Sequence, residues 1–205
     1  MNVKGTNVRG RTQAERSEAT RGALVSAARP LFAERGYAGV GTEEIVRAAG
    51  VTRGALYHQF CDKADLFAAV AEEVEAEISE RVAAGASAAT GPVEALRAGA
   101  RLFLDACADP EVERIILLDA PAVHGWEAWR ALAGRYGLGL VRLGLQSAMD
   151  AGGIVPQPIA PLAHILIGAL DEAALYVAGA ENPAAAREEC AEIFDRIVRG
   201  FTAGT

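Results

Sequence analysis

The chain is poor in cysteine and carries no long uncharged apolar run. Its three cysteines, Cys61, Cys107 and Cys190, are odd in number and far apart, which argues against a disulfide framework and favours a reducing compartment. The most apolar stretch, 161–179, is interrupted by charged residues such as Asp171, so we expect a buried helix there and not a membrane span. Because no secretory h-region opens the chain, we expect a cytoplasmic protein with no membrane partner.

Motifs of common enzyme chemistry are also missing. The three histidines, His58, His124 and His164, are scattered, and no HExxH or Cys-x-x-Cys spacing offers a metal site. No serine lies in a Gly-x-Ser-x-Gly elbow. We therefore predict no enzyme, no metal and no cofactor. A reactive pair of Cys107 with His124 stays as an alternative, although a buried structural cysteine is the more common case.

Alternating strands rich in valine, isoleucine and threonine are missing too, and helical patterns run through the chain. Breaks at glycine and proline divide the region after Lys63 into six expected helices. These lie near 64–87, 93–107, 111–118, 125–150, 160–179 and 184–201. With three more helices before Lys63, the sequence predicts an all-α protein of about nine helices.

Positive charge is concentrated near the N-terminus. The net charge of −7 alone argues against a nucleic-acid partner, but residues 1–63 hold 10 Lys/Arg against 6 Asp/Glu, while residues 64–205 hold 10 against 21. This asymmetry is typical of a small DNA-binding domain joined to a different body. We expect domains at 1–62 and 63–205. Residues 1–13 are expected to be disordered, either as an arm that reaches DNA or as a simple tail.

The segment 40–70 has the outline of a helix-turn-helix. Thr42 and Thr52 are expected to cap two short helices, because a threonine hydroxyl accepts from the free amides of the first turn. Gly50 is expected to end the first helix in a left-handed conformation. The second helix would then enter the major groove and read base edges with its N-terminal residues.

The second helix of this outline has two different faces. Leu56 and Phe60 are spaced i, i+4 and are expected to face inward. Tyr57, His58 and Gln59 are expected to face outward, where polar side chains can reach phosphates or bases.

The order of residues at 50–60, Gly-Val-Thr-Arg-Gly-Ala-Leu-Tyr-His-Gln-Phe, with Asp-Lys at 62–63 and Asp-Leu-Phe at 65–67, resembles the TetR family of transcriptional repressors. The resemblance extends back through Leu-Phe-Ala-Glu-Arg-Gly-Tyr at 31–37. It implies an N-terminal helix-turn-helix domain and a C-terminal helical domain that binds an effector and dimerises.

The resemblance also assigns the DNA-binding residues. It implies phosphate contacts for Thr42, Tyr57 and Lys63, and contacts to bases or nearby backbone for Arg53, Gly54, Ala55 and His58, beside the cap Thr52. Arg53 is the expected direct reader, since arginine pairs bidentately with guanine. Gln59 stands where the family often has histidine, and it could read adenine or bind a phosphate.

The family keeps a small-molecule pocket among its middle helices. Aromatic and apolar residues of this region are expected to line it: Phe103, Cys107, Leu117, His124, Trp126, Trp129, Tyr136 and Met149. Plain core packing is the alternative for any one of them. The expected effector is an unidentified, partly apolar small molecule.

The last two expected helices are apolar on more than one side, so one side should need a partner. The expected interface of a two-fold homodimer comprises Leu162, Ile165, Leu166, Ala169, Ala173, Tyr176, Ile193, Phe194, Ile197 and Phe201. Together these features predict a repressor that leaves a palindromic double-stranded operator when an effector binds. A redox sensor at Cys61 is the remaining alternative.

Overall fold

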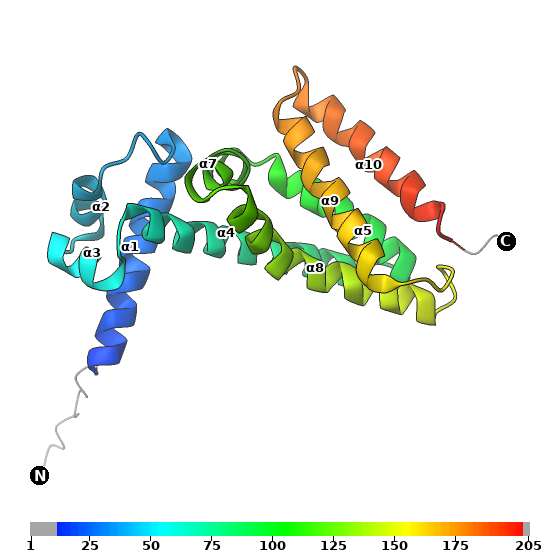
Figure 1. Cartoon of the computed structure of the whole chain (residues 1–205), viewed down its shortest axis with the longest axis horizontal. Helices are drawn as coiled ribbons and strands as arrows, with labels where there is room; N and C mark the ends of the chain where they lie inside the picture. The colour runs from blue at the N-terminus through cyan, green and yellow to red at the C-terminus, as the bar shows by residue number, and fades with distance from the viewer. Residues whose placement is uncertain (1–11, 203–205) are drawn as a thin grey trace, which may run out of the picture.

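The computed structural model describes residues 12–202 (Figure 1). Within them the chain is helical apart from loops and one isolated antiparallel bridge between Ile154 and Thr202. The helices are α1 Gln13–Arg35, α2 Thr42–Ala49, α3 Arg53–Gln59, α4 Lys63–Ser87, α5 Pro92–Cys107, α6 Pro110–Val112, η1 Glu113–Asp119, α7 Ala120–His124, α8 Trp126–Asp150, α9 Ile159–Ala178 and α10 Pro183–Arg199. The predicted all-α class is confirmed.

The predicted end of a helix at residue 118 is wrong. The helices α6, η1 and α7 follow one another without a gap, so 110–124 is one helical segment and the described residues hold nine such segments. The segment changes to π-type hydrogen bonding in η1, and Pro121 then lies in the first turn of α7. Within this continuous segment Pro121 has no amide to donate to the preceding turn, and the π-type hydrogen bonding of η1 lies immediately before it.

The N-terminal domain is a three-helix unit that packs through α1 (Figure 1). Most of the predicted disordered arm lies outside the described residues, but Thr12 and Gln13 do not fit it. Thr12 is the N-cap of α1, and it forms a reciprocal capping box with Glu15. The two extra hydrogen bonds hold the start of this long helix in place.

The C-terminal body is a bundle in which α4, α5, α8, α9 and α10 pack against one another. Its core continues into the N-terminal domain through buried residues such as Phe32 and Phe67. By length and composition alone, α9 could cross a membrane, with a mean hydropathy of 1.3 over 18 residues. In the fold it packs against α5, α8 and α10, as expected of a core helix.

Candidate functional site

The turn between α2 and α3 has the geometry that the sequence predicts, with one exception. Gly50 adopts the left-handed conformation at φ 66° and ψ 28°, and the Thr52 hydroxyl accepts from the amide of Ala55 at 3.2 Å. The exception is Thr42, which is the first residue of α2, whereas Gly41 is its N-cap. A glycine cap can leave the first amides open because these residues lie at the surface.

The polar face of α3 is open to solvent. Leu56 and Phe60 are buried, as predicted, and they fix the inward face of the helix. Thr52, Arg53 and Gly54, at the start of α3, are exposed, and so are Tyr57 and His58. Thus the end of the helix that would enter a groove first is accessible to a partner.

Arg53 already has partners on this face. Its Nη1 lies 2.9 Å from Oε1 of Glu43, and its guanidinium lies 5.6 Å from the ring centre of Tyr57. The side chains of both Arg53 and Glu43 are more than 60% exposed, so solvent and salt screen this ion pair strongly. The pair can therefore hold Arg53 in position in free protein and give way to a nucleic-acid contact.

Two of the predicted DNA contacts have internal partners. Gln59 does not face fully outward, because it is half-buried and its amide donates to Ser17 Oγ in α1 at 2.8 Å. Lys63 donates from Nζ to the carbonyl oxygens of Tyr37 and Val40, at 2.9 and 3.0 Å. The Nζ of Lys63 also lies 4.0 Å from the ring centre of Tyr37. Lys63 is thus held against the turn after α1, and Gln59 links α3 to α1.

The C-terminal body contains a cavity of about 610 Å³ between α4, α5, α8, α9 and α10. Its wall is mostly apolar, with Leu96 and Phe103 of α5, Val141 of α8, Leu166 of α9 and Phe194 of α10. A size of roughly 300–1,000 Å³ and an apolar wall are usual for small-molecule sites.

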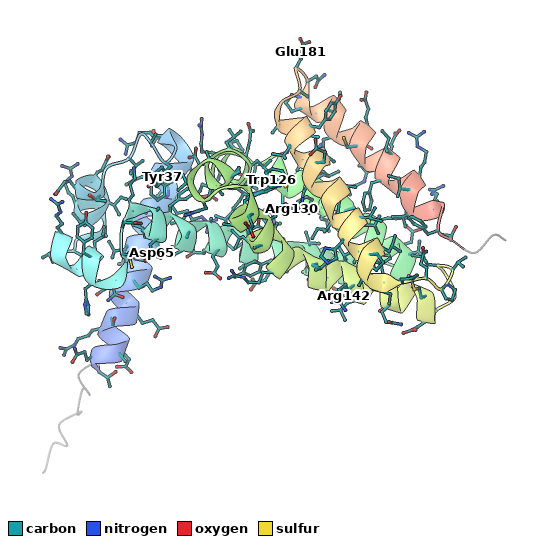
Figure 2. All side chains as sticks on the ribbon, viewed as in Figure 1. Tyr37, Asp65, Trp126, Arg130, Arg142 and Glu181 are labelled. Carbon is teal, nitrogen blue, oxygen red and sulfur yellow. The ribbon has the colours of Figure 1, made fainter. Side chains whose placement is uncertain are left out.

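Of the eight predicted pocket residues, Phe103 lines this cavity and the other seven do not. Cys107, Leu117 and Trp129 are buried in the core, Met149 is partly buried, and Trp126 is exposed. The ring of His124 stacks on Phe67, and the Tyr136 hydroxyl donates to Glu72. The aromatic residues of 119–136 include Trp126, labelled with Arg130 near the start of α8 in Figure 2, whereas α8 lines the cavity farther along, with residues such as Gly137, Leu140 and Val141.

The thiol of Cys107 is not placed for nucleophilic chemistry. Burial raises its pKa, and the nearby carboxyl groups of Glu75 and Asp171 raise it further. A thiol with a raised pKa holds little of the reactive thiolate. Neither Cys107 nor His124 lines the cavity.

Two acidic residues that sequence reasoning missed lie in the cavity wall. Glu75 of α4 and Asp171 of α9 are 5% and 6% exposed, and no hydrogen bond or ion pair within residues 12–202 engages either carboxyl group. Burial raises the pKa of Glu75 to about 7, with a contribution from Asp171, and burial raises the pKa of Asp171 to about 6. The sequence contains one signal of this acidic site, because Asp171 interrupts the most apolar helix.

The raised pKa of Glu75 predicts a pH-dependent stability. The folded-state value of about 7 exceeds the ordinary 4.5, so folding binds a proton between these values and stability falls as the pH rises through 7. Replacing Glu75 with glutamine should therefore raise the free energy of unfolding by about 1–3 kcal/mol at pH 8 and change it little at pH 4.5. Urea denaturation at both pH values measures the difference. The exposed Glu80→Gln, on the same helix, should change neither value.

The outer faces of α9 and α10 carry large exposed apolar residues. Ile165 and Tyr176 of α9 are 66% and 60% exposed, and Ile193 and Ile197 of α10 are also exposed. The predicted interface is wrong for three residues that are buried within the protomer. Leu166 and Phe194 line the cavity, and Leu162 belongs to the core. Ala169, Ala173 and Phe201 are partly buried. Contiguous exposed apolar faces of this kind mark association sites.

The N-terminal domain is joined to the cavity-bearing body by polar contacts. Arg29 of α1 forms ion pairs with Glu73 and Glu77 of α4 and with Glu111 of α6, at 3.1, 2.6 and 2.9 Å. The amide of Tyr37 donates to Asp119 Oδ2 at 2.6 Å. Figure 2 shows Tyr37 where the N-terminal domain meets α7.

Aromatic packing completes this joint. Phe67 of α4 is fully buried, with its ring centre 5.1 Å from Phe32, 5.3 Å from Tyr37 and 5.7 Å from His124. It thus contacts α1, the turn that follows α1, and α7. Since α4 also supplies Glu75 to the cavity wall, one helix links the cavity to the N-terminal domain that carries α3.

Protein families and individual proteins with similar sequences are known. Residues 24–70 match the family model described as bacterial regulatory proteins, tetR family, and residues 93–201 match the tetracyclin repressor-like C-terminal domain. The transcriptional regulator CymR of Pseudomonas putida is 45% identical over 71 residues, 35% of each chain. AcrR of Shigella flexneri is 41% identical over 66 residues, 32% of this chain and 31% of its own. The match thus spans about a third of these relatives.

Solved structures match over nearly the whole chain. A TetR-family transcriptional regulator from Pectobacterium atrosepticum is 33% identical, with a TM-score of 0.84 over 95% of this chain and 99% of its own. RolR in complex with resorcinol has the same fold at 21% identity, with a TM-score of 0.74 over 92% and 95%. The helix-turn-helix, the helical body and these matches show that the chain belongs to the TetR family of transcriptional regulators.

Proposed function

We propose that this protein is a ligand-responsive repressor that binds double-stranded operator DNA as a homodimer in the cytoplasm. The observation that carries the proposal is the exposed polar face of α3, on a domain joined through α4 to a body with a cavity. In the proposed switch, an effector in the cavity moves α4 and changes the placement of α3.

The outer faces of α9 and α10 supply the proposed dimer contact. A two-fold pairing of these helices would form a four-helix interface and repeat α3 on the partner. Recognition helices of such dimers reach successive major grooves when they lie roughly 34–36 Å apart. The operator is therefore expected to be palindromic.

The cavity is the proposed effector site. Its volume and apolar wall suit a small molecule. RolR, which has the same fold, was solved with the small aromatic molecule resorcinol. A coupling of about 1–3 kcal/mol between effector and operator is enough for a 5–150-fold change in operator affinity.

The test of DNA reading is a titration with DNA from the flanks of the protein's own gene, beside scrambled DNA of the same length, over a salt series. Wild-type protein should bind the flank DNA more tightly, with an affinity that falls steeply with salt. Replacing Arg53 with alanine should weaken flank binding by about 1–3 kcal/mol and reduce the preference over scrambled DNA.

The matched control is Arg142→Ala, which removes an exposed arginine from α8 in the body (Figure 2). It should leave both affinities unchanged. If Arg53→Ala behaves like Arg142→Ala while wild-type protein still prefers the flank DNA, then Arg53 is not the reader. If a selection from whole genomic DNA also yields no preferred site, the repressor proposal fails.

A further inference from the structure

The charged residues that line the cavity are all acidic. Its wall contains Glu75 and Asp171 and, among the described residues, no lysine, arginine or histidine. The two carboxyl groups come from different helices, α4 and α9, and both are more than nine-tenths buried. Burying a carboxyl group without a hydrogen-bond partner opposes folding, so their presence in an apolar wall calls for a ligand that pairs with them.

The remaining wall suits the apolar part of such a ligand. The side chains of Ile78, Leu96 and Leu140 are aliphatic, and Phe103 and Phe194 add two aromatic rings. Aromatic faces attract a cation as well as apolar groups. The cavity therefore offers an apolar wall with two acidic residues. The charge of Arg130, outside the lining, acts on Asp171 only, and no basic residue lines the cavity itself.

We propose that the effector is an amphipathic organic cation, whose apolar body fills the cavity and whose ammonium or amidinium group pairs with Glu75 and Asp171. This inference rests on the proposed function, because it names the chemical class of the effector for the same cavity. A neutral ligand would leave both carboxyl groups without a charged partner, and an anion would meet two acids.

The pairing has a proton signature. In free protein at pH 6, Glu75 is mostly protonated and Asp171 is about half protonated, because their pKa values are raised to about 7 and about 6. A cation favours the ionised carboxylate, so its binding should release protons at pH 6 and few or none at pH 8.5. The neighbouring Cys107 and Tyr136 do not titrate in this range, because burial raises the pKa of the thiol and of the phenol.

The experiment uses three probes with one skeleton: 4-phenylbutyltrimethylammonium, neutral 4-phenylbutanol and anionic 4-phenylbutyrate. Isothermal calorimetry on the full chain without DNA gives each dissociation constant at pH 6 and pH 8.5. Buffers of different ionisation enthalpy give the number of protons released. The quaternary ammonium has no proton of its own, so any release comes from the protein.

At pH 8.5 the cation should bind at least about tenfold more tightly than the alcohol, as expected for a charge-assisted contact. The double variant Glu75→Gln with Asp171→Asn should bring the two probes to similar affinity and abolish the proton release. Glu80→Gln, an exposed acid on α4, should keep both effects. The double variant removes two buried charges and should unfold no more easily than wild type, which thermal denaturation checks.

Equal affinities for the cation and the alcohol would overturn the proposal, and so would a cation affinity that the double variant leaves unchanged. Failure of all three probes to bind would overturn it as well. Operator affinity measured without any probe is independent of these results. If the protein prefers its operator but does not bind the cation, only the proposed effector class fails. If the protein shows no preference for any DNA sequence, the proposed function fails.

Discussion

Replacing Phe67 with alanine is expected to lower the free energy of unfolding by about 3–5 kcal/mol, since deletion of a buried aromatic ring leaves a cavity. Phe67 is fully buried and packs against Phe32, Tyr37 and His124, which belong to both domains. The substitution should therefore weaken the packing of the N-terminal domain against the body as well as the packing of the core. Urea denaturation followed by circular dichroism measures the change.

The partly buried Phe201, at the end of α10, provides the comparison. Phe201→Ala removes the same number of atoms from a more exposed position, so its cost should be clearly smaller. A Phe67→Ala protein that loses less than the Phe201→Ala protein would contradict the description of Phe67 as the aromatic centre of the joint.

Placing aspartate at both Ile165 and Tyr176 is expected to separate the homodimer and to lower operator affinity about 10³-fold or more. A single protomer keeps one α3, and specific binding exceeds non-specific binding typically by a factor of 10³–10⁷. Both side chains are at least 60% exposed in the protomer, so the substitutions should spare its core. Analytical ultracentrifugation gives the mass, and fluorescence anisotropy gives the operator affinity.

Leu118→Asp is the matched control, because Leu118 is an exposed apolar residue of η1, outside α9 and α10. It should remain dimeric and keep its operator affinity. A doubly substituted protein that stays dimeric would show that another surface forms the interface. A monomer with full operator affinity would show that the two-fold arrangement is not needed for DNA binding.

The helix-turn-helix was predictable because its structure depends on local signals. Gly50 is needed for a left-handed turn, Thr52 supplies a cap, and the spacing of Leu56 and Phe60 defines the inner face. Each signal acts within a few residues, so the sequence alone reveals it. The partners of Gln59 and Lys63 were not predictable, because Ser17, Tyr37 and Val40 come from distant positions in the chain.

The cavity could not be predicted for a related reason. Its wall combines five helices, and the choice between core, cavity and surface depends on how they cross. Aromatic content pointed to Trp126 and Trp129, but one is exposed and the other is buried outside the cavity. The apolar stripes of α9 were recognised correctly as two-sided. Their assignment failed because Leu162 and Leu166 turn inward while Ile165 turns outward.

The most direct test of the account is the coupling between the cavity and the operator. A compound that raises the melting temperature of wild-type protein, and loses this effect in the Glu75→Gln, Asp171→Asn variant, is a cavity ligand. Operator affinity is then measured with and without a saturating amount of it, and ligand affinity with and without operator. If the cavity is coupled to the operator-binding helices, effector and operator should each weaken the binding of the other by the same factor, about 5–150-fold. An operator affinity that stays the same when the cavity is filled would contradict this coupling.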